Sequence, residues 1–197
     1  MTGRIVPRLG AMSGLLYFVV IFAGGLFGGD TGRRIELIGM LFFLPFLGYL
    51  WSVLRRAEGA EGWLSTTALG AGLAGFIVKI ASAAPLLAAG NEAEGTRLHD
   101  ALVNMNDISF IVTMLPLGVF AAAVATVTLT TDVLPRWLGW LAAITAPALV
   151  VNGLFFGSTE GPAFLLFLLW LFATSVVLTL RAGAAPVAAT DPRPVAA

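Results

Sequence analysis

The sequence predicts an all-α fold, namely a polytopic membrane protein built as a six-transmembrane-helix bundle. Hydrophobic residues make up 58% of the 197 residues, charged residues only 11%, and the mean hydropathy is +0.94. Soluble domains carry about 25% charged residues, so this chain lacks the polar surface that water requires. Six long apolar stretches complete the evidence, and the environment that we expect for them is the lipid bilayer.

Each of the six stretches is long enough to cross a membrane as a helix. About 20 mostly apolar residues span the ~30 Å hydrocarbon layer, and lipid offers no partner for free backbone groups, which favours helices. The stretches are 9–29, 35–54, 63–89, 101–130, 137–157 and 162–180. The links are short and polar, so we assign 1–180 to one transmembrane domain. Residues 181–197 are rich in Ala and Pro and are expected to form a disordered tail.

Arginine residues divide unequally between the two sides of this predicted topology. One side carries Arg4, Arg8, Arg55, Arg56, Arg136, Arg181 and Arg193, and the other carries Arg33, Arg34 and Arg97. The Arg-rich side also holds Trp51, Trp63, Trp137 and Trp140. Positive charge favours the cytoplasmic side, and Trp favours the interface. We therefore expect a multi-pass protein of the cytoplasmic membrane, with both termini and the tail in the cytoplasm and the first helix retained.

Composition excludes several classes of function. Eleven Lys and Arg balance eleven Asp and Glu without a basic run, so nothing marks a nucleic-acid partner. The absence of Cys rules out thiol catalysis and Cys-held metal centres. The sequence contains no zinc-protease, phosphate-loop or nucleophile-elbow motif. We expect neither enzyme activity nor a cofactor.

Small residues and prolines predict where helices approach closely and where they bend. Small residues four apart let backbones come together; such pairs are Gly24/Gly28, Gly25/Gly29 and Ala71/Gly75, with Gly72 beside the last. Proline removes a backbone donor and crowds the preceding turn. We expect kinks at Pro45, Pro85, Pro116 and Pro147.

Three runs of sequence carry a family likeness: GLLYFVVIFAG (14–24), LHDALVNMNDISFIVTMLPLGVF (98–120) and LPRWLGWLAAI (134–144). Together they resemble a bacterial family of six-helix integral membrane proteins of unknown function. The resemblance implies the same six-helix topology. It implies no particular chemistry, because no activity comes with the family.

Lys79 is the clearest candidate for a functional residue. Charged groups within a membrane span are rare, and a functional role is the first interpretation for each of them. At 1.5 Å per residue it lies about 15 Å from the outer end of its apolar stretch. Its helix face also carries Gly72, Gly75 and Ser82, which predicts contact with a neighbouring helix. The alternative is a lysine that snorkels to the outer interface.

The fourth stretch supplies a polar stripe on one helix face, formed by Arg97, Asp100, Asn104 and Asp107 at spacings of 3, 4 and 3. Counted from the outer link, Asp107 and Lys79 reach similar depth, and we then expect them to form a buried ion pair. Counted from the cytoplasmic ends, their depths differ by about 10 Å, and Asp107 then lies at the interface. The candidate intramembrane cluster is Lys79, Asp100, Asn104 and Asp107.

Other polar residues have simpler interpretations. Asn106 is expected to point away from the stripe, and Glu36 to favour the positive N-terminal end of the second helix. The outer link carries nitrogen and oxygen side chains of the types that bind divalent cations, namely Glu92, Glu94, His99 and Asp100. A solvated acidic loop accounts for them equally, and we predict no metal site.

Two classes of function remain after these exclusions. The leading expectation is a non-enzymatic accessory or structural membrane subunit, whose partner is another membrane protein or a second copy of this chain. The abundance of small residues favours it. The alternative is a small transporter or channel with a polar path along the fourth helix and Lys79. Water and further polar side chains around Lys79 discriminate between them.

Overall fold

The structure is a computed structural model that describes residues 2–27, 29–90, 94–157 and 161–183. Every regular element in these ranges is a helix, so the predicted all-α bundle is confirmed. The elements are α1 (Thr2–Phe27), α2 (Gly29–Leu41), α3 (Phe43–Glu58), α4 (Trp63–Ala81), α5 (Ala83–Ala89), α6 (Arg97–Thr131), α7 (Arg136–Val151), the π-helix η1 (Asn152–Phe156) and α8 (Pro162–Gly183).

These elements form six units long and apolar enough to cross a membrane. They are Val6–Phe27, Thr31–Glu58, Trp63–Ala89, Arg97–Thr131, Arg136–Phe156 and Pro162–Ala182. All six predicted stretches are confirmed, but two boundaries change. The predicted link 30–34 lies within α2, and Arg181, predicted to begin the tail, lies within α8. Residues 184–197 of the predicted tail lie outside the described residues.

Two of the four prolines divide a span into two helices. Proline clashes with the carbonyl four residues earlier. Four residues before Pro45 is Leu41, the last residue of α2, and four before Pro85 is Ala81, the last residue of α4. Pro116 lies inside an unbroken α6, and Pro147 lies inside α7, one turn before η1. The predicted effect of proline is therefore strongest at Pro45 and Pro85.

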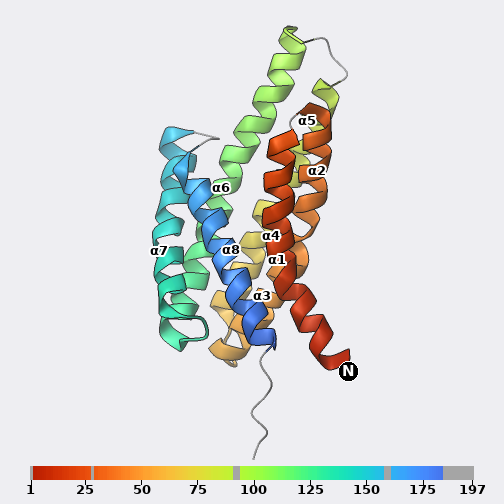
Figure 1. Cartoon of the computed structure of the whole chain (residues 1–197). Coiled ribbons are helices and arrows are strands. Elements are labelled where there is room, and N and C mark those ends of the chain that lie inside the picture. Colours follow the sequence, from red (N-terminus) through yellow and green to blue (C-terminus); the bar gives the residue numbers. More distant parts are fainter. Residues whose placement is uncertain (1, 28, 91–93, 158–160, 184–197) are drawn as a thin grey trace, which may run out of the picture.

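The six units form a closed ring in sequence order (Figure 1). α1 packs against α2 and α3, α3 against α4, α4 and α5 against α6, α6 against α7, and α7 against α8, which returns to α1. Because consecutive units alternate in direction, the start of α1 and the end of α8 lie at the same end of the bundle. We call this the lower end, and the end where α6 begins the upper end.

The arginines follow this division. Arg8, Arg55, Arg56, Arg136 and Arg181 belong to helix segments at the lower end, and Arg33, Arg34 and Arg97 to segments at the upper end. Three tryptophans at the lower end are more than half exposed, namely Trp63, Trp137 and Trp140. These arginines and the three exposed tryptophans of the lower end therefore lie together in three dimensions, whereas Trp51 is partly buried and Arg193 lies outside the described residues.

An aromatic core holds the middle of the ring together. Phe46, Phe120, Phe167 and Trp170 are at most 1% exposed. The Phe120 ring meets Trp170 edge-on at 5.6 Å and Phe167 at 6.3 Å between centroids, a favourable geometry for aromatic pairs. These residues come from α3, α6 and α8, so the core joins three units.

The predicted small-residue contacts hold at three positions and fail at two. A Cβ atom added to Gly72 would lie 2.8 Å from Leu47 Cδ1. A Cβ atom added to Gly75 would lie 3.0 Å from Leu117 Cδ2, and one added to Gly24 would lie 2.5 Å from Glu36 Cγ. These glycines permit close helix packing. Gly25 and Gly29 have no atom within 4 Å of such a Cβ, so they make no helix contact. Gly28 lies outside the described residues.

Candidate functional site

A cavity of about 270 Å³ lies inside the ring, between the aromatic core and the upper end. We call it the upper cavity. Five of the six units line it, all except the α7–η1 unit. The lining residues are Tyr17, Ile21, Glu36, Met40, Phe43, Gly75, Phe76, Lys79, Asn106, Asp107, Phe110, Thr113, Leu117, Phe164 and Phe167. Small-molecule pockets start at about 300 Å³, so the upper cavity approaches the size needed for a small ligand.

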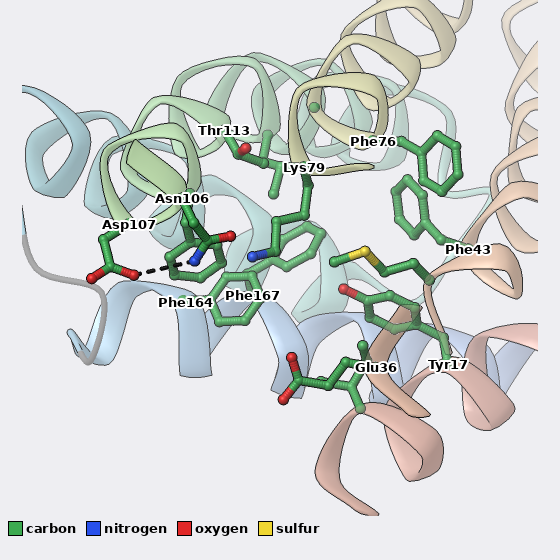
Figure 2. Close-up of a pocket in the computed structure, with 15 residues that line it drawn as sticks. Tyr17, Glu36, Phe43, Phe76, Lys79, Asn106, Asp107, Thr113, Phe164 and Phe167 are labelled. Carbon is green, nitrogen blue, oxygen red and sulfur yellow. Dashed lines mark hydrogen bonds between the residues drawn. The ribbon is translucent and has the colours of Figure 1, made fainter. Parts of the chain in front are cut away.

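Lys79 extends from the last turn of α4 into this cavity (Figure 2). Its Nζ atom lies 4.6 Å from the centre of the Phe110 ring, within the range of a cation–π interaction. Glu36 and Asp107 are the two carboxylates whose charges act on it. The structure thus supports the predicted contact of Lys79 with neighbouring helices rather than snorkelling along the outer surface.

Asp107 lines the same cavity as Lys79, so depth counted from the upper end is the correct count. Among the described residues, however, no ion pair within 4.0 Å joins Lys79 to Asp107 or to Glu36. Asn106 Nδ2 instead donates a hydrogen bond of 3.2 Å to Asp107 Oδ1. Figure 2 shows the Asn106 amide on the side of Asp107 that faces Lys79.

Asn106 lies on a different face of α6 from the predicted stripe of Arg97, Asp100, Asn104 and Asp107, but its amide reaches Asp107 and lines the cavity. The cavity faces a stripe of α6 at spacings of 4, 3 and 4, formed by Asn106, Phe110, Thr113 and Leu117. Asp107 lies at the edge of this stripe, since neighbouring helix positions are about 100° apart. Of the predicted stripe formed by Arg97, Asp100, Asn104 and Asp107, only Asp107 lines the cavity among the described residues.

Asp100 and Asn104 do not belong to the site. Both are exposed, and neither lines the cavity. The reason is the length of α6, which has 35 residues and begins beyond its neighbours at the upper end (Figure 1). Its first two turns therefore have no ring around them. Of the candidate cluster, the structure brings together Lys79 and Asp107 alone.

Glu36 and Tyr17 are site residues that the sequence analysis missed. Glu36 was assigned to a helix N-terminus, but α2 begins at Gly29, so Glu36 lies two turns inside, beyond the reach of the helix end. Tyr17 is 7% exposed and lies halfway along α1, where its hydroxyl is the polar tip of a buried side chain. A polar group in the middle of an apolar span was the available signal for Tyr17.

Gly24 makes room for Glu36. A Cβ atom on Gly24 would meet Glu36 Cγ at 2.5 Å and the Gly32 carbonyl oxygen at 2.9 Å. The absence of a side chain at this position lets α1 and α2 approach closely and leaves space for the glutamate. One of the predicted close-contact glycines thus supports the site directly.

A second, much smaller cavity of about 20 Å³ adjoins the first. The two share Glu36, Met40, Lys79 and Asn106, and the smaller one continues to Arg33 and Ser82 towards the upper end. Its volume is about that of one water. Glu36 and Lys79 therefore lie where the upper cavity continues towards the membrane surface.

The acidic residues before α6 do not assemble a metal site within the described part of the chain, where no three His, Asp or Glu residues gather. His99 has a different role. Its backbone N–H donates to the Thr96 hydroxyl, which caps α6, and its Nδ1 lies 3.1 Å from the Ala89 carbonyl oxygen at the end of α5. Glu92 lies outside the described residues.

The upper cavity offers charged and aromatic groups around one space inside the ring. It contains one ammonium, two carboxylates, an amide, a phenol and a threonine hydroxyl, surrounded by phenylalanine rings. Such a lining can bind and orient a small amphipathic molecule. No protein family, curated protein or solved structure matches the chain.

Proposed function

We propose that the protein is a small membrane transporter that binds its solute in the upper cavity. The observation that carries the proposal is the convergence of Glu36, Lys79 and Asp107 on one cavity inside a ring of apolar helices. A charged side chain inside the hydrocarbon layer is costly, by roughly 2.5 to 3.5 kcal/mol at the membrane centre and less towards the surface. Three such groups around an empty volume are expected where a solute passes, and they have no evident use in a purely structural subunit.

The proposed orientation has the lower end in the cytoplasm and the membrane as a bacterial cytoplasmic membrane. The arginines and the exposed tryptophans at the lower end support it. A reporter that is active only in the periplasm, fused after Ala197, should give no signal. A strong signal from that fusion contradicts this orientation, and the upper cavity then opens towards the opposite compartment.

Access of water-soluble reagents to the cavity tests the transport proposal. The chain contains no cysteine, so a single introduced thiol reports one position. Thr113 lines the cavity and is 3% exposed, and Thr113→Cys places a thiol of similar size there. Thr126→Cys is the matched control, because Thr126 lies on the same helix and is exposed on its outer face.

The test applies a membrane-impermeant methanethiosulfonate reagent to each side of oriented vesicles. A transporter that opens alternately to both sides should let the reagent modify Thr113→Cys from either side, whereas Thr126→Cys, on the outer face of the ring, should stay unmodified. Modification from one side only indicates a binding cavity without transport. No modification from either side contradicts the proposal and favours the accessory-subunit function.

The accessory function is the second candidate, and one feature supports it. An open groove of about 470 Å³ runs between α6 and α7, lined by small and apolar residues that include Gly118, Ala122, Ala143 and Ala146. Small residues allow close approach of another transmembrane helix. This groove is on the outside of the ring and shares no residue with the upper cavity.

A further inference from the structure

We infer that the solute is a small organic cation and that Lys79 is a tethered cation that the solute displaces. The inference deepens the proposed function, on which it rests, by naming the substrate class of the upper cavity. The geometry that carries it is the placement of two carboxylates and several aromatic rings around a lysine that contacts a ring and forms no ion pair with either carboxylate among the described residues.

The charges that face the cavity leave a negative balance. Among the described residues, α2 contributes Glu36, α6 contributes Asp107 and α4 contributes Lys79, so the formal sum is −1. In the same part of the chain, α1 contributes the neutral Tyr17 and α8 contributes Phe164 and Phe167. A bound monovalent cation brings this sum to zero, whereas a monovalent anion brings it to −2 in a region of low dielectric.

Within the part of the chain that the structure describes, Arg33 is the other charged side chain that borders these two cavities. It borders the smaller cavity, one helical turn before Glu36, and does not line the upper cavity. Its charge acts on Glu36 from the side of the upper end. A cation that has reached the phenylalanine rings therefore meets the two carboxylates, with Arg33 behind one of them.

The aromatic lining is suited to an ammonium group. The phenylalanines that border the cavity are Phe43, Phe76, Phe110, Phe164 and Phe167. The faces of aromatic rings attract cations, as in the aromatic cages that bind quaternary ammonium ligands. Phe110 already holds the Lys79 ammonium at 4.6 Å. The structure thus places the Lys79 amine over one ring of the surface that we assign to the solute.

Lys79 can leave that surface because its contacts are weak individually. Its flexible four-carbon chain carries a compact charge, and within the described residues its ammonium is farther than 4.0 Å from both carboxylates. When a solute ammonium takes the place over Phe110, Lys79 moves away from it, and Glu36 and Asp107 face the solute. Lys79 is then a competitor for cations and not a ligand for anions.

The charge selectivity of thiol modification tests the inference on the full chain. Thr113→Cys is treated in vesicles with a cationic reagent, methanethiosulfonate ethyltrimethylammonium, and with an anionic one, methanethiosulfonate ethylsulfonate. Each rate is divided by that of the same reagent with a free thiol in solution. A cleft with charge of one sign raises the local concentration of counter-ions by about 10- to 1000-fold, so we expect the cationic reagent to be favoured at least about tenfold.

Charge variants then assign the selectivity to individual residues. In the Thr113→Cys background, Glu36→Gln and Asp107→Asn should each lower the preference for the cationic reagent. Lys79→Met should raise it, since the tethered competitor is gone. Asp100→Asn is the matched control, because Asp100 lies on α6 with Asp107 but is exposed outside the cavity, and it should change nothing.

A second measurement avoids any dependence on the cysteine variant. Tetraethylammonium chloride should raise the melting temperature of the unmodified protein in detergent, with sodium benzoate at equal ionic strength as the anionic comparison. Lys79→Met should enlarge the shift caused by tetraethylammonium. If benzoate raises the melting temperature and Lys79→Met abolishes that rise, the inference is overturned, because Lys79 then binds an anion.

The failure of this inference differs from the failure of the proposed function. Equal or reversed reagent preference at a Thr113→Cys that both sides can reach overturns the cation assignment and leaves transport supported. A Thr113→Cys that neither side can reach, together with no stabilisation by tetraethylammonium, overturns both. The inference is supported if tetraethylammonium raises the melting temperature, the cationic reagent modifies Thr113→Cys faster than the anionic one, and Glu36→Gln reduces that preference.

Discussion

The aromatic core and the upper cavity share α3, α6 and α8, but the core is closely packed and the cavity is not. α6 contributes Phe120 to the core and Phe110 to the cavity, ten residues apart on the chain. Phe120 is fully buried and meets three aromatic rings, from Phe43, Phe167 and Trp170. Phe110 has Phe164 on one side and the Lys79 ammonium over its face.

The difference shows what holds each region together. In lipid, helices associate through close packing, because the surrounding tails are as apolar as the side chains. The core has this close packing and no charge. The cavity has three charged groups and a volume that side chains do not fill, so its walls must be held by the core below them. We expect stability to depend on the core and solute binding on the cavity.

The largest expected effect separates the two phenylalanines. Phe→Ala costs about 3 to 5 kcal/mol in soluble cores, and we expect Phe120→Ala to cost an amount near the lower end of that range, since lipid replaces water in the unfolded reference state. Phe110→Ala should cost clearly less, because the ring already lacks packing partners on its cavity side. Unfolding in detergent with increasing denaturant measures both. Equal losses would contradict the distinction between core and cavity.

A smaller effect is expected for two glycines on α4. Gly72→Ala places a methyl group against Leu47 and Phe120 of the packed region, with the nearest atom at 2.8 Å, and overpacking typically costs about 1 to 3 kcal/mol. Gly70 faces open space, so Gly70→Ala should be neutral or should stabilise by up to about 1 kcal/mol through helix propensity. Melting temperatures of the two variants check the prediction. A Gly72→Ala protein as stable as Gly70→Ala would show that the packed region adjusts freely.

The smallest effect is the coupling between Lys79 and Asp107. Removing one partner of a contacting buried ion pair costs about 3 to 5 kcal/mol, but these two residues make no direct ion pair, and the Asn106 amide binds Asp107. A double-mutant cycle of Lys79→Met and Asp107→Asn should therefore give a coupling of about 1 kcal/mol or less. The control cycle with Asp100→Asn should be additive within about 0.5 kcal/mol. A coupling above about 2 kcal/mol would show that the two charges contact each other.

The sequence by itself determined the membrane class, the six spans and the division of arginines between the two ends. These features follow from the length and composition of single segments, since each helix satisfies its own backbone hydrogen bonds and needs about 20 apolar residues to cross lipid. The effect of Pro45 and Pro85 was predictable for the same reason, because a proline acts on its own preceding turn. Lys79 was identified because a charge is costly inside any span.

Only the tertiary structure decided which polar residues share a cavity. The sequence pattern grouped Asp107 with Asp100 and Asn104 on one helix face, but α6 extends past the ring, so the latter two remain outside. Glu36 lines the same cavity as Lys79, and Gly24 leaves space for its side chain. Helix periodicity gives the angle of a residue around its own axis. The offset between neighbouring helices, which decides what that residue meets, comes from packing across the whole ring.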